Sequence, residues 1–106
     1  MAAKSRSPAW TPPAYSLKDL DAVRAVARGE ASKAEQLKAV DWIVNHSCLT
    51  YDLSFRSDAD GGDRDTAFAE GRRFAGMQIV KLINMPTSFI AQMRKTDAAK
   101  KDQTNG

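Results

Sequence analysis

The sequence predicts a small all-α domain of three main helices, with flexible basic tails and a short fourth helix. Three observations lead to this prediction. Apolar residues recur every three to four positions over three stretches of the 106-residue chain. Two of these stretches follow a serine that has an acidic residue three positions later, the pattern of a capping box. Glycine and proline lie between the stretches, where helices end.

Length and composition allow one domain. The chain is 42% hydrophobic and 27% charged, the balance of a globular protein rather than a disordered one. We divide it into a disordered N-terminal arm (1–14), a helical domain (15–86), and a short amphipathic helix with a disordered basic tail (87–106). A core of this size stabilises a fold only modestly. We therefore expect self-association or docking onto a protein partner.

The first two helices are predicted to form a hairpin. Ser16 precedes the first, over residues 17–28, and Ser32 precedes the second, which continues to about residue 46. Gly29 supplies the left-handed residue that ends the first helix. Because the connection is so short, the two helices must lie antiparallel or at a steep angle.

The next stretch is predicted to be irregular. Residues 49–55 alternate imperfectly and are rich in β-formers, but one short strand has no partner, so we expect an extended connector or a continuation of the helix. Residues 56–65 contain two glycines among aspartates, which indicates a solvated loop.

The third helix is predicted from Asp65 or Thr66 to about Asn84. Its apolar arc is wider than a two-helix contact requires, and Gly71 and Gly76 each cost about 1 kcal/mol relative to alanine in a helix interior. Either another segment approaches closely at these glycines, within the fold or across an interface, or they are tolerated defects.

Two arginines follow each other in the middle of this helix. Arg72 lies on the apolar stripe, so we expect it to be partly buried and to need an acidic partner. Asp63, Asp65 or an acidic group across an interface meets that need. A structural ion pair is favoured over a ligand-binding role, with Arg72 and Arg73 as polar anchors.

After Pro86, residues 88–101 are predicted to form a short amphipathic helix around Phe89, Ile90 and Met93. This helix either packs back on the bundle or offers these residues to a partner as an apolar patch.

The sequence indicates no catalytic site, no metal site and no cofactor. In an EF-hand loop starting at Asp58, position 6 is Asp63 instead of glycine, and position 12 is Ala69 instead of glutamate. His46 and Cys48 are the only histidine and cysteine, whereas a metal site needs three or four ligands. No phosphate-binding glycine loop or hydrolase motif appears. We therefore expect a protein that is not an enzyme and takes no small-molecule substrate.

Nucleic acid is an alternative partner. The chain carries a net charge of +3, concentrated towards its ends. The helical hairpin has the outline of a DNA-reading motif, in which Lys33 and Lys38 would make the contacts. A plain helical hairpin without DNA binding is the favoured interpretation.

Residues 67–82 resemble the Glu-Gly-Arg-Arg-x-x-Gly-x-x-Ile/Val segment of a family of small tailed-phage proteins named after a Bordetella phage member. Gly71, Arg72, Arg73 and Gly76 are the matching positions. The resemblance extends over roughly residues 20–86 and implies a phage origin, but no reaction, cofactor or functional residue.

Together these observations predict a non-enzymatic bacteriophage protein that acts by protein–protein contacts in the virion or its assembly. The alternatives are a small nucleic-acid-binding factor in packaging or regulation, and a phage inhibitor of a host enzyme. The single cysteine, and the lack of an apolar run of signal or membrane length, favour the host cytoplasm or the virion without membrane association.

Overall fold

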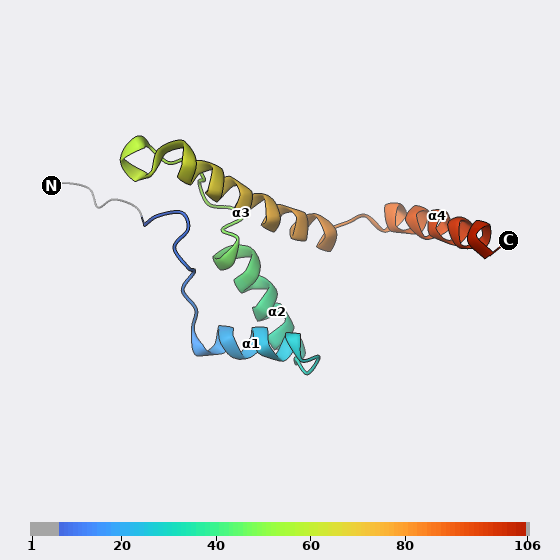
Figure 1. The fold of residues 1–106 in the computed structure, drawn as a ribbon. Helices are drawn as coiled ribbons and strands as arrows, with labels where there is room; N and C mark the ends of the chain where they lie inside the picture. The colour runs from blue at the N-terminus through green and yellow to red at the C-terminus, as the bar shows by residue number, and fades with distance from the viewer. Residues whose placement is uncertain (1–6, 106) are drawn as a thin grey trace.

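The computed structural model describes residues 7–105, and the side chains of residues 7–100. Within this part of the chain every regular element is helical, so the predicted all-α class is confirmed (Figure 1). The elements are α1 (Leu17–Ala27), α2 (Lys33–Asp41), the π-helical turn η1 (Trp42–Ser47), the 3₁₀ turn η2 (Asp58–Asp60), α3 (Gly62–Ile83) and α4 (Thr87–Asn105).

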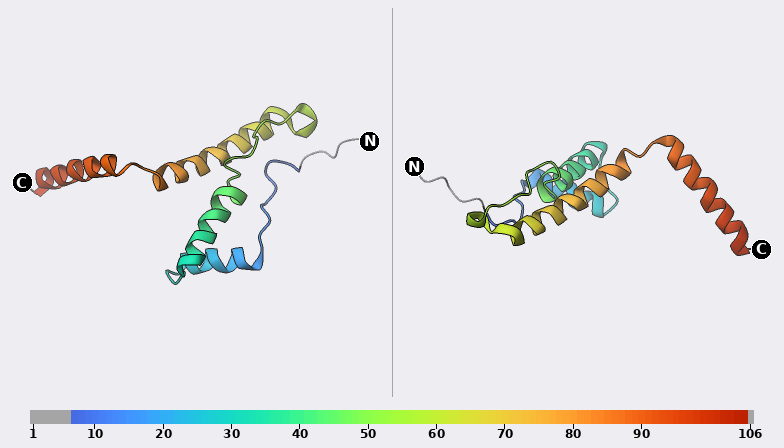
Figure 2. Two further views of the ribbon diagram at one scale, coloured as in Figure 1. Left: turned by 180° about the vertical axis from the view of Figure 1, so that it is seen from behind. Right: turned by 90° about the horizontal axis from the view of Figure 1, so that it is seen from above.

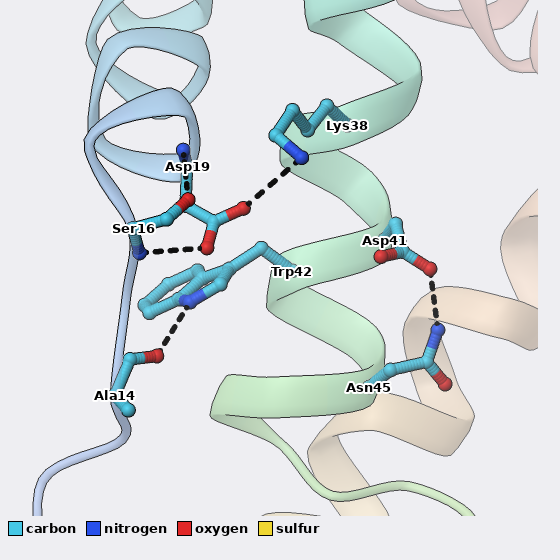
Figure 3. A network of polar contacts seen from close by, with 7 residues as sticks. All are labelled: Ala14, Ser16, Asp19, Lys38, Asp41, Trp42 and Asn45. Atoms are coloured by element: carbon cyan, nitrogen blue, oxygen red, sulfur yellow. Dashed lines mark hydrogen bonds and ion pairs between the residues drawn. The ribbon is translucent and has the colours of Figure 1, made fainter.

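The helices α1 and α2 form the predicted hairpin, and both capping boxes are present. At the start of α1 the Ser16 hydroxyl accepts from the Asp19 amide at 3.1 Å, and the Ser16 amide donates to the Asp19 carboxylate at 2.9 Å. That amide lowers the pKa of Asp19, with smaller contributions from the Ser16 hydroxyl and from Lys38. Lys38 reaches Asp19 from α2, with 3.6 Å between Nζ and Oδ1 (Figure 3).

The chain leaves α2 through η1, which connects the hairpin to α3. The Cys48 amide donates to the Ile43 carbonyl at 2.9 Å, five residues back, as expected for a π-helical turn. The buried Thr50 hydroxyl then donates to the Val44 carbonyl at 2.7 Å. Leu49, between them, has a positive φ of 46°. These bonds fold residues 48–50 back onto η1.

Residues 7–14 are held by specific contacts, although they were predicted as part of a disordered arm; residues 1–6 of that arm lie outside the described residues. We call residues 7–14 the strap. The Trp42 indole donates to the Ala14 carbonyl at 3.0 Å (Figure 3). At the other end of the strap, the amide of the buried Ala9 donates to Asp65 on α3 at 3.0 Å.

The helix α3 begins earlier than the sequence predicted. Gly61 has a φ of 101°, a left-handed conformation that lets the chain pass from η2 directly into the helix at Gly62. The expected solvated loop over 56–65 therefore already contains a 3₁₀ turn and the first helical residues. The end of α3 at Ile83 agrees with the prediction.

The helix α4 is longer than expected and projects from the rest of the chain (Figure 2). It continues to Asn105, beyond the predicted segment 88–101, because no glycine or proline interrupts residues 87–105. The stretch expected as a disordered basic tail is thus helical up to that residue. The molecule measures 70 × 33 × 22 Å and has a radius of gyration of 19.2 Å. A compact chain of this length has a radius of about 13 Å.

The fold encloses little apolar volume. Among the described residues, the buried apolar side chains are Val44, Cys48 and the four alanines Ala9, Ala22, Ala39 and Ala69. Large apolar side chains stay exposed along all four helices. Examples are Leu17, Leu37, Phe74, Leu82, Ile83 and Phe89. The hairpin, the strap and α3 therefore meet through small residues and hydrogen bonds rather than through a large core.

Candidate functional site

An apolar surface lies where α3 meets α4. We call it the junction surface, and its apolar residues are Leu82, Met85, Phe89, Ile90 and Met93. They line an open groove of about 790 Å³, and its polar rim comes from α4 residues between 92 and 100. Two of the side chains are about half exposed, Phe89 at 55% and Met93 at 52%.

Local sequence explains this geometry. Pro86 cannot continue α3, so the chain leaves the helix after Ile83 and starts a new one. The Pro86 carbonyl accepts from the amides of Phe89 and Ile90, both at 3.1 Å, and so opens α4. Phe89 and Met93, four residues apart, consequently share one face of α4. The three patch residues predicted from the sequence lie together on the groove.

Large apolar side chains are also exposed earlier on α3. Phe74 is 62% exposed and Met77 is 45% exposed, whereas Gly76 is buried. The face of α3 that carries Gly76 thus packs towards η1, and the Phe74 and Met77 side chains remain exposed. This accounts for the wide apolar arc seen in the sequence.

Gly71 and Gly76, the two glycines in the interior of α3, have different surroundings. A Cβ on Gly76 would lie 1.8 Å from Thr50 Oγ1 and 2.8 Å from Cys48 Cβ, so the predicted close approach occurs here, within the fold. Within the part of the chain that the structure describes, Gly71 has no neighbour within 4 Å of a Cβ. Close packing inside the chain therefore explains Gly76 and not Gly71.

The adjacent arginines Arg72 and Arg73 of α3 also differ. Arg73 pairs with Glu70 at 3.0 Å on the surface. A hydrogen bond from Ser54 lowers the pKa of Glu70, and the charge of Arg73 lowers it further. Arg72 is half-buried, and its guanidinium carbon lies 5.8 Å from the centre of the Phe68 ring.

The predicted ion pair of Arg72 with Asp63 or Asp65 is wrong: among the described residues neither carboxylate lies within ion-pair distance of it. Asp65 instead accepts a hydrogen bond from the strap, at Ala9. No local pattern predicts that the strap donates to Asp65, because Ala9 and Asp65 are 56 positions apart.

Arg56 is a residue that sequence reasoning missed. It was assigned to the solvated loop, yet it is only 7% exposed. Its amide donates to the Thr66 hydroxyl at 2.7 Å, and its guanidinium donates to the Ser7 carbonyl. Arg56 and Arg72 line one pocket beneath the strap. No local pattern indicates this burial, since it depends on segments far apart in the sequence.

The lysines predicted to contact DNA do not form a basic cluster. Lys38 is engaged with Asp19, and Lys33 is an exposed first residue of α2. The remaining candidates for chemistry stay separate. Cys48 is buried and His46 is exposed. Over residues 7–100 no group of three or more His, Cys, Asp or Glu side chains is placed to hold a metal ion.

None of the described helices combines the length and the apolar character needed to cross a membrane. Comparison of the chain with family models, with curated proteins and with solved structures finds no match.

Proposed function

We propose that this chain is a non-enzymatic assembly protein of a bacteriophage, which works by burying its junction surface against a second copy of itself. The observation that carries the proposal is the imbalance between a core made mainly of alanines and an uncovered row of large apolar side chains on α3 and α4. The phage origin depends on the resemblance of residues 67–82 alone.

A monomer would leave this apolar surface in water. Full burial of one large apolar side chain contributes about 1.5–3 kcal/mol, so each half-exposed residue of the junction surface has roughly half of that to gain. Monomers rarely expose apolar patches of this kind without an interaction to cover them. Association would therefore supply the stability that the alanine core does not.

A second copy is the occupant that fits best, because one segment carries both the groove and the exposed apolar side chains that can fill such a groove. Phe89 and Met93 stand on the wall of the groove that they line. Two copies related by a two-fold axis can therefore each place these side chains in the other's groove. Such isologous contacts are the commonest form of soluble oligomer.

The experiment is a light-scattering mass measurement on three proteins. The natural chain is expected to be an oligomer of defined mass. Phe89→Asp should shift it to the monomer, because a carboxylate in the groove would be buried without a partner. The control is Leu37→Asp, which changes a side chain that is 71% exposed on α2, away from the junction surface.

A monomeric natural chain contradicts self-association, and equal effects of the two aspartate variants contradict the assignment to the junction surface. Capture of a host enzyme by the monomer would favour the inhibitor alternative. Nucleic-acid binding would instead appear as a mass increase with duplex DNA that falls steeply with salt and is weakened by Lys33→Ala.

A further inference from the structure

A second feature lies beneath the strap, away from the junction surface. An open pocket of about 290 Å³ is lined by the strap, η1, α3 and the segment between η1 and η2. Its charged and titratable lining consists of Arg56, Arg72 and His46, and no acidic side chain among the described residues contributes to it.

The positive charges of this pocket are not compensated within the described fold. The Nε atoms of Arg56 and Arg72 are both shielded from solvent and have no hydrogen-bond partner among the described residues. Neither arginine forms an ion pair with a described carboxylate. Asp52 lines a smaller neighbouring cavity with both arginines but makes no ion pair with either.

Such an arrangement is costly without a ligand. A buried guanidinium needs an anion or several acceptors to offset its lost hydration, and two near each other also repel. Arg56 has one neutral acceptor, the Ser7 carbonyl, and this bond holds its side chain in position. Arg72 is held by the face of Phe68. Both side chains are thus fixed while their charges remain unmatched.

From this juxtaposition we infer that the pocket binds an oxyanion, a carboxylate or phosphate group, between the guanidinium groups of Arg56 and Arg72. The planar fork of arginine matches the two oxygens of such a group, and hydrogen bonds between ions are about twice as strong as neutral ones. The anion is either a free small molecule or an acidic side chain of another chain. The inference does not depend on the junction surface.

The test uses the full chain labelled with ¹⁵N and titrated with inorganic phosphate, with sodium chloride adjusted to keep the ionic strength constant. The Nε–H resonances of Arg56 and Arg72 are expected to shift in a saturable way, while that of Arg73 stays in place. Arg72→Met should weaken phosphate binding by about tenfold or more, the loss expected for one charged hydrogen bond.

Arg73→Met is the matched control, since it removes the same charge from the next position on α3, where the side chain already pairs with Glu70. It should leave the affinity unchanged. Arg72→Lys keeps the charge without the fork and should also weaken binding, which covers the case in which the methionine variant does not fold.

Light scattering distinguishes the two sources of the anion. If the pocket takes an acidic side chain of a second copy, saturating phosphate lowers the mass; if it takes a free anion, the mass does not change. The inference is overturned if the arginine resonances do not shift, or if Arg72→Met and Arg73→Met weaken binding equally, since that indicates general attraction to a basic protein.

Discussion

Adding one methyl group at each of the two interior glycines of α3, Gly71 and Gly76, should have opposite effects. Gly71→Ala places the methyl group in open space, so the protein should gain about 1 kcal/mol from the higher helix propensity of alanine. Gly76→Ala gains the same propensity, but its Cβ would lie 1.8 Å from the Thr50 hydroxyl oxygen. The pair therefore isolates packing from propensity within one helix.

The cost at Gly76 follows from what surrounds Thr50. This side chain is 1% exposed, and its hydroxyl donates to the Val44 carbonyl at 2.7 Å, so it has no free space to rotate into. Overpacking costs about 1–3 kcal/mol, and loss of the hydrogen bond from a buried hydroxyl adds about 1–3 kcal/mol. After the propensity gain, Gly76→Ala should lower the free energy of unfolding by about 3 kcal/mol.

Urea denaturation followed by circular dichroism measures both variants, at one protein concentration because association changes apparent stability. A double-mutant cycle then locates the cause. Since Thr50→Ala removes the clashing oxygen, Gly76→Ala should cost less in that background, with a coupling of about 1 kcal/mol or more. A Gly76→Ala protein as stable as the natural chain, or a cycle without coupling, would refute the proposed packing of α3 on η1.

Three further changes test other contacts. Asp19→Asn should remove the stability contribution that comes from the lowered pKa of Asp19. This contribution is complete above the ordinary carboxyl pKa and is lost as the pH falls through the lower pKa of the folded state. The acid-unfolding curves of the natural chain and the variant should therefore converge at the lowest pH. Trp42→Phe removes the indole hydrogen bond to Ala14, so deuterium uptake of the strap should rise while uptake of α3 stays unchanged. Arg73→Met breaks only an exposed pair with Glu70 and should change the free energy of unfolding by less than about 0.5 kcal/mol in urea denaturation; a larger loss would contradict that assignment.

Local patterns predicted the hairpin well because its signals are local. The capping boxes at Ser16 and Ser32 and the stop at Gly29 each depend on residues within a few positions. The start of α3 was missed by three or four residues because the glycine pair was interpreted as a loop, whereas Gly61 is a left-handed cap before the helix. The sequence predicts a shorter α4 because the apolar face around Phe89 and Met93 does not extend into the second half of the helix.

Contacts between distant segments could not be predicted. The patch around Phe89 follows from periodicity after Pro86, so the sequence indicated it. The burial of Arg56 depends on Ser7 and Thr66, and nothing in residues 56–65 suggests such partners. The same applies to Asp65, whose carboxylate accepts a hydrogen bond from Ala9 of the strap and does not pair with an arginine among the described residues.

Self-association through the junction surface is tested most directly by the light-scattering mass of the purified chain, at low and moderate salt, with and without duplex DNA. The proposed function predicts one defined oligomer under all four conditions, because burial of apolar surface depends little on salt and not on DNA. A monomer whose mass rises only with DNA at low salt would contradict it and favour the nucleic-acid alternative.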